Sequence, residues 1–169
     1  MSEFPFIDLH THQPKPSNTQ NWSILNIMAG NPLPNDPLIK CSYGIHPWQI
    51  KAGNLTYLIK KLKQEAAKQQ VIAIGEAGLD KLIETPIKEQ ETIFELHIEI
   101  ALENNKPLII HCVKAYSELL AMRKKYPSGV WIIHGFGGKA ELAKQLIDKD
   151  IKLSIGSALT KQNRNISKL

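Results

Sequence analysis

The stretch FIDLHTHQP, from Phe6 to Pro14, starts with an apolar run and then places two histidines one residue apart. Side chains alternate between the two faces of a β-strand, so His10 and His12 would point in the same direction if the run is a strand. Both imidazoles could then reach one metal ion. The stretch alone is equally compatible with two surface or capping histidines on a loop, so the rest of the chain has to decide.

Similar short apolar runs recur along the chain and predict further strands. Together with residues 6–10, the predicted strands are residues 23–28, 40–45, 71–75, 107–112, 130–135 and 152–155. Several of these are continuous apolar runs, which are typical of strands in a parallel sheet that is covered on both faces.

Amphipathic segments lie between these runs and predict helices. The predicted helices are residues 54–69, 85–104, 115–125 and 139–149. In the first of them apolar residues recur on one face, and Asn54 is a candidate N-cap. Strands that alternate with helices predict right-handed βαβ units and an α/β fold with a parallel sheet.

The composition predicts a single cytoplasmic domain covering residues 1–169. The chain is 43% hydrophobic and 22% charged, which is near the average of soluble domains. Its apolar runs are shorter than the roughly 20 residues of a membrane-spanning helix, and its N-terminus lacks a secretory signal pattern. We therefore expect no membrane partner. The formal net charge of +5 modestly favours a polyanionic partner such as DNA.

Polar side chains with metal-binding chemistry gather at the ends of the predicted strands. Five of the six histidines follow strands, and Glu76 and Asp80 follow the run at 71–75. The histidines are His10, His12, His46, His111 and His134. In parallel α/β folds, the carboxyl ends of the strands are the edge where active sites are built. One histidine at a strand end is more often structural, but five together with a glutamate favour a site.

Imidazole and carboxylate groups are the ligands of Zn²⁺ and similar divalent ions. Enough of them are present to hold two ions, and Glu76 is a candidate bridge between the ions; the candidate ligands are His10, His12, His111, His134 and Glu76. Paired ions of this kind lie about 3.5–4 Å apart and activate a water for attack on phosphate esters.

Five motifs, FIDLHTH, GIHPW, AIGEAGLD, PLIIHC and IIHGFGG, occur in this order between residues 6 and 155. Together they resemble the TatD family of metal-dependent deoxyribonucleases. The resemblance implies a (β/α) TIM-type barrel of the metal-dependent hydrolase superfamily. It also implies that the protein cleaves phosphodiester bonds of DNA with a metal-activated water. It implies two divalent ions, Zn, Mg or Mn, and assigns Glu76 to both of them as the central catalytic residue.

The same resemblance assigns the other motif residues. It gives His10 and His12 to one ion and His111 and His134 to the other, and it places Asp8 beside the first pair as a supporting residue. His46 would lie near the substrate rather than on a metal. Lys114 stands close to the position where the family usually has an arginine and an aspartate. We expect Lys114 to meet a substrate phosphate as a point charge.

The chain also departs from the family pattern at its end. The family has an eighth strand that ends in a metal-binding aspartate, whereas this sequence stops at Leu169 without either. We therefore expect an incomplete barrel of about seven strands, a weaker first metal position and self-association through the open seam. Two alternatives stay open: a catalytically weak or inactive metal-binding barrel, and a hydrolase that acts on a different ester or amide.

Two further side chains could be confused with site residues. His97 lies inside the predicted helix 85–104, and we expect it to be a partly buried structural histidine. Trp48, directly after His46 and Pro47, could stack on a base or could belong to the core or the rim.

Overall fold

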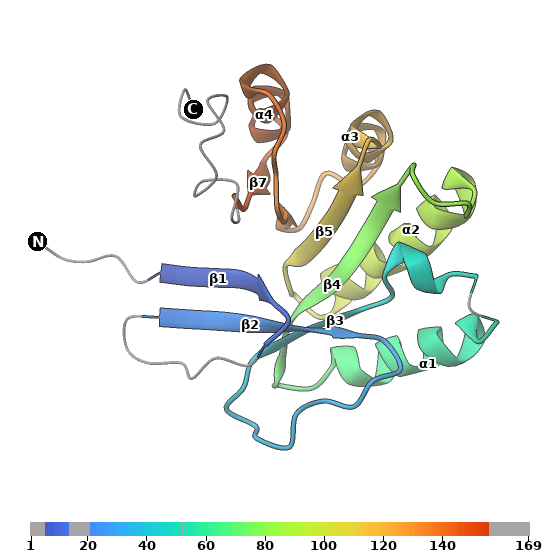
Figure 1. The fold of residues 1–169 in the computed structure, drawn as a ribbon, viewed down its shortest axis with the longest axis vertical. Helices are drawn as coiled ribbons and strands as arrows, with labels where there is room; N and C mark the ends of the chain where they lie inside the picture. Colours follow the sequence, from blue (N-terminus) through green and yellow to red (C-terminus); the bar gives the residue numbers. More distant parts are fainter. Residues whose placement is uncertain (1–5, 14–20, 52, 156–169) are drawn as a thin grey trace, which may run out of the picture.

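The computed structural model describes residues 6–13, 21–51 and 53–155, and these form a curled sheet with helices packed along its outer side (Figure 1). The strands are β1 (Phe6–Thr11), β2 (Asn21–Met28), β3 (Cys41–Gly44), β4 (Val71–Asp80), β5 (Leu108–Val113), β6 (Trp131–Ile133) and β7 (Ile151–Leu153). The helices are α1 (Leu55–Ala66), α2 (Ile87–Glu103), α3 (Tyr116–Lys125) and α4 (Ala140–Ile147), with a 3₁₀ turn η1 (Pro47–Gln49).

The sheet confirms the predicted fold class. All seven strands are parallel and are ordered as in the chain, from β1 to β7. In the described part of the chain this sheet does not close on itself, so the architecture is an incomplete TIM-type barrel. The expected absence of an eighth strand concerns residues 156–169, which lie outside the described residues. No helix within the described ranges is both long and apolar enough to cross a membrane.

The predicted elements agree with the structure except at one important boundary. The strand predicted to end at Gly75 continues to Asp80 as β4, because residues 77–80 pair with β5 after a register shift. Gly78 permits this pairing: it has a φ of +148°, and a Cβ there would lie 2.0 Å from the carbonyl oxygen of His111. Only glycine allows so close an approach of the two backbones. As a result Glu76 lies inside a strand and Asp80 at its end.

The hydrophobic core lies between the strands and the helices. Large side chains from both layers are almost fully buried, among them Leu62, Phe94, Leu108 and Trp131. The rings of Phe94 and Trp131 meet edge to face with their centroids 5.6 Å apart. Burial of each such side chain contributes about 1.5–3 kcal/mol to stability. This packing fixes the carboxyl ends of the strands, where the polar cluster described below is located.

Candidate metal centre

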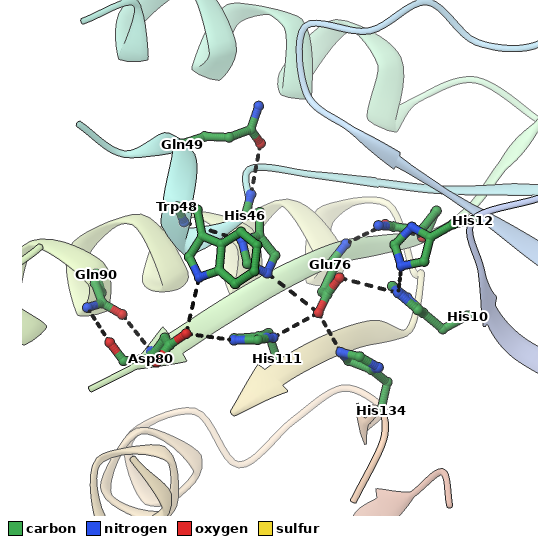
Figure 2. A network of polar contacts seen from close by, with 12 residues as sticks. His10, His12, His46, Trp48, Gln49, Glu76, Asp80, Gln90, His111 and His134 are labelled. Atoms are coloured by element: carbon green, nitrogen blue, oxygen red, sulfur yellow. Dashed lines mark hydrogen bonds and ion pairs between the residues drawn. The ribbon is translucent and has the colours of Figure 1, made fainter. Parts of the chain in front are cut away.

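Glu76 is the centre of a cluster of imidazoles from four separate segments of the sheet edge (Figure 2). Glu76 is only 6% exposed. Oε1 lies 2.9 Å from Nδ1 of His111 and 3.6 Å from Nε2 of His46, and it also contacts Nε2 of His134. Oε2 lies 3.3 Å from Nε2 of His10. Residues that are far apart in the sequence thus converge on one buried carboxylate.

His12 joins this cluster through His10. The Nε2 atoms of the two rings lie 3.2 Å apart, and the rings meet edge on with their centroids 4.8 Å apart. His10 is part of β1 and His12 follows its last residue, so the alternation of side chains brings both rings to the same side as expected.

The donor set fits a divalent ion. Two ligand atoms bound to one Zn²⁺ at about 2.0–2.2 Å in a tetrahedral shell are about 3.3–3.6 Å apart. The spacing of 3.2 Å between His10 and His12, and of 3.3 Å between His10 and Glu76, is close to this range. Glu76 and the imidazoles also border a cavity of about 210 Å³. Its lining consists of His10, His12, Asn26, Met28, His46, Trp48, Glu76, His111 and His134.

The donors form two groups that share Glu76. In one, Glu76 lies with His10 and His134, and in the other with His46 and His111; within each group the ligand atoms lie within 4.8 Å of one another. The resemblance pairs His111 with His134, whereas in these groups His134 lies with His10 and His111 lies with His46. The rings of His10 and His134 are stacked, with their centroids 4.2 Å apart.

Electrostatics keep the central carboxylate ionised. Burial by itself would raise the pKa of Glu76, but hydrogen bonds from His111, His134 and His46 outweigh it and hold that pKa far below its usual value. Burial lowers the pKa of His10 to about 4, against a weaker opposing pull from Glu76. His10 is therefore neutral near pH 7, as a metal ligand must be.

The backbone of Glu76 is held by buried polar groups of the neighbouring strands. Its N–H donates to Oδ1 of Asn26 over 3.1 Å, and the same oxygen accepts a hydrogen bond of 3.2 Å from Oγ of Ser42. Gly44 makes this approach possible, because a Cβ there would lie 2.5 Å from Cα of Gly75. These contacts fix Glu76 against β2 and β3.

Asp80 orients His111, and the sequence did not identify it as a site residue. Oδ2 of Asp80 accepts hydrogen bonds from Nε2 of His111 over 3.2 Å and from Nε1 of Trp48 over 3.1 Å. With its Nε2–H directed to Asp80, His111 turns Nδ1 toward Glu76. A carboxylate behind a metal-binding histidine is a common supporting arrangement. The available signal was the AIGEAGLD motif, but the predicted strand stopped at Gly75 and left Asp80 outside it.

The buried carboxylate of Asp80 is ionised as well. Burial would raise its pKa, but the N–H groups of Leu82, Trp48 and His111 lower it overall. His111 thus lies between two carboxylates. Burial lowers its pKa, whereas the hydrogen bonds to Glu76 and Asp80 raise it, and the net effect is an increase.

His46 is held by the turn that it starts. Its Nδ1 accepts a hydrogen bond of 3.3 Å from the N–H of Trp48, and its own N–H donates to Oε1 of Gln49 over 3.0 Å. In the neutral form the hydrogen of His46 is then on Nε2, the atom that faces Glu76. His46 therefore presents a hydrogen-bond donor to the cavity rather than a lone pair.

His97 holds the backbone just before this turn. It is fully buried, its Nε2 accepts a hydrogen bond of 2.9 Å from the N–H of Ile45, and its Nδ1–H donates to the carbonyl of Ile93 over 2.7 Å. The expected structural role is what the contacts describe, although the side chain is more deeply buried than expected.

A model of the family described as TatD related DNase matches residues 17–169. The chain belongs to the TatD-related DNase family. YcfH of Escherichia coli K12, an uncharacterized metal-dependent hydrolase, is 33% identical over 126 residues, which are 72% of this chain and 46% of YcfH. The human 3′-5′ RNA nuclease TATDN2 is 30% identical over 128 residues, 73% of this chain and 17% of that protein. The chain thus spans about half the length, or less, of these relatives.

Solved TatD structures have the same fold. The crystal structure of YjjV, a TatD homologue of Escherichia coli K12, superposes with a TM-score of 0.80 at 20% identity, covering 96% of this chain and 72% of YjjV. A TatD-family hydrolase of Entamoeba histolytica gives a TM-score of 0.62 at 20% identity, covering 88% and 64%. The family predicted from the five motifs is confirmed.

Of two further residues assigned from the TatD resemblance, Lys114 lies outside the imidazole cluster and Asp8 lies beside His10. Lys114 is exposed, has a φ of 52° just after β5, and is not part of the cavity lining given above. Asp8 lies on β1, where its Oδ1 is 3.4 Å from the backbone nitrogen of His10. The roles assigned to Lys114 and Asp8 stay predictions.

Proposed function

We propose that this TatD-family chain is a divalent-metal-dependent hydrolase that cleaves phosphodiester bonds of nucleic acid, with DNA as the first substrate to test. The observation that carries this proposal is the convergence of four imidazoles on the ionised carboxylate of Glu76. The family description, the nuclease name of the human relative and the net charge of +5 support the choice of substrate.

The residues divide between two adjoining positions. His10, His12 and His134 would hold one ion with Glu76, and His111 would hold a second ion with Glu76. We propose Zn²⁺, Mg²⁺ or Mn²⁺ for both. Bound ions of this kind supply a water of lowered pKa and positive charge near the phosphoryl oxygens.

The remaining polar groups would act on the substrate and on the ligands. His46, which presents Nε2–H to the cavity, would donate a hydrogen bond to a non-bridging phosphate oxygen. Asp80 keeps His111 in the orientation that directs Nδ1 toward Glu76, where this atom would serve as a ligand in place of its hydrogen bond to the carboxylate. The exposed Lys114 would attract a more distant phosphate.

A matched pair of variants tests this function. In Glu76→Gln a neutral amide replaces the shared carboxylate. We therefore expect the rate at which a labelled single-stranded DNA is cleaved in Mn²⁺ to fall by about 10² or more. Glu99→Gln, at an exposed position of α2, should retain the wild-type rate. Wild-type rates in chelator, or in a folded Glu76→Gln protein, would contradict the proposal. Zinc binding without turnover on DNA or RNA would favour the inactive metal-binding alternative.

A further inference from the structure

Trp48 is an exposed aromatic ring whose orientation is fixed by polar contacts. Its side chain borders the cavity and is 65% exposed. Nε1 donates a hydrogen bond of 3.1 Å to Oδ2 of Asp80, which is itself only 4% exposed. The backbone of Trp48 is part of η1, whose start is fixed by the reciprocal hydrogen bonds of His46 and Gln49. The ring is therefore preorganised although most of it is not packed.

The ring stands next to the imidazoles of the metal centre. Its centroid lies 4.7 Å from that of His46, at an interplanar angle of 77°, and 6.3 Å from that of His111, at 76° (Figure 2). The indole is thus nearly perpendicular to both imidazoles and forms a wall beside them. A planar group that stacks on this wall would lie at the border of the cavity that Glu76 and the imidazoles line.

A single exposed hydrophobic side chain is ordinary on a protein surface. Trp48 differs because its one polar atom is directed to a buried carboxylate that also holds a candidate metal ligand, His111. Trp22 offers a comparison, since it is 52% exposed on β2 but is not among the residues that line the cavity.

We infer that Trp48 is the base-stacking platform of this site and that it positions the nucleobase adjacent to the scissile phosphate. This inference rests on the proposed nuclease function and adds a residue that contacts substrate. Stacking on an indole needs an unpaired base with a free face and tolerates all four bases. The site would therefore recognise an unpaired nucleotide by its ring and its phosphate, with little preference for sequence.

Binding measurements separate stacking from a structural role. The probes are fluorescein-labelled oligothymidylates with phosphorothioate linkages, which resist cleavage, and versions with one abasic position placed at each site in turn. Anisotropy titrations in Mg²⁺ should show that the wild-type chain binds one abasic version about tenfold more weakly than the complete strand. Trp48→Leu should bind the complete strand as weakly as that abasic version, and should bind the abasic version as the wild type does.

Two further variants serve as controls. Trp48→Phe keeps a ring and should retain most of the difference between complete and abasic strands, whereas Trp22→Leu should behave as the wild type does. If Trp48→Leu weakens both strands equally, or if the wild type does not distinguish them, stacking by Trp48 is wrong while the nuclease proposal stands. If the wild type neither binds nor cleaves any oligonucleotide, the proposed function fails and the inference fails with it.

Discussion

Nε2 of His111 lies 3.2 Å from Oδ2 of Asp80, and Nδ1 of the same ring lies 2.9 Å from Oε1 of Glu76. One imidazole therefore connects two buried carboxylates that are four residues apart on β4. Glu76 is available to hold ions, whereas Asp80 has its oxygens engaged by N–H groups. This division of roles makes the supporting carboxylate separately testable.

Asp80→Asn should weaken metal binding without removing a direct ligand. The amide cannot match the charge of the carboxylate behind His111, and loss of such a partner typically costs about 10- to 100-fold in metal affinity. Isothermal titration of the chelator-treated protein with Zn²⁺ would measure this change. Asp148→Asn, at an exposed position after α4, is the control and should bind Zn²⁺ normally. Equal affinity in both variants would show that Asp80 does not support the site.

Metal affinity should fall as the pH is lowered, and the fall should start above the ordinary titration range of histidine. The two carboxylates raise the pKa of His111, and its protonated ring cannot serve as a ligand. Competition by protons therefore starts at a higher pH than for an unperturbed imidazole of about 6.5. Zinc titrations between about pH 8 and about pH 5 would follow the loss. In Asp80→Asn the decline should begin at a lower pH, and an unchanged profile would contradict this account.

His97 should make the folded chain sensitive to acid. Burial lowers its pKa from 6.5 to about 4, so between these values the unfolded chain binds a proton that the folded chain does not. The contribution of His97 to the free energy of unfolding is thus fully present above pH 6.5 and is lost as the pH falls toward 4. The loss is about 1.4 kcal/mol per pH unit and about 3 kcal/mol in total.

Urea unfolding of the metal-free protein at neutral and acidic pH would test the role of His97. His97→Gln can donate and accept but cannot be protonated, so its stability should fall less steeply with acid than that of the wild type. Other groups titrate in both proteins and cancel in the difference. The same slope in both would mean that His97 does not contribute.

Gly78→Ala should destabilise the β4–β5 pairing. The new Cβ would lie 2.0 Å from the carbonyl oxygen of His111, at a φ of +148° that side chains rarely adopt. We expect a loss of at least about 2 kcal/mol in the free energy of unfolding, because backbone atoms have to move. Gly137→Ala is the control, since a Cβ at Gly137 meets nothing within 4 Å. Unfolding curves that coincide for the two variants would rule out this explanation for Gly78.

The sequence predicted strands such as β5 and β6 well because each begins with a continuous apolar run that is buried in the sheet. It also predicted that His10, Glu76, His111 and His134 share one edge, since parallel strands bring their carboxyl ends together. Periodicity could not show that β4 continues beyond Gly75, because that depends on glycines that admit a neighbouring backbone. For this reason Asp80 was missed as the partner of His111.

The contacts between individual imidazoles were also beyond the reach of sequence patterns. Which imidazole lies next to which depends on the curvature of the whole sheet and on side-chain torsions. His46 illustrates the limit: its orientation follows from a hydrogen bond within η1, which a motif of residue types does not describe. The stacking of His10 on His134 likewise joins β1 to the residue that follows β6, and these two strands are not neighbours in the sheet.

The stacked pair brings distant parts of the chain together at the metal centre. His10 comes from β1 and His134 follows β6, 124 positions later in the chain, yet both contact Glu76. An ion held by these three side chains would be a cross-link across the mouth of an open sheet. Cross-links between distant positions remove more freedom from the unfolded chain than those between close ones. The first strand, which pairs only with β2 in the described part of the chain, would owe part of its rigidity to the ion and would exchange its amide hydrogens faster once the ion is removed.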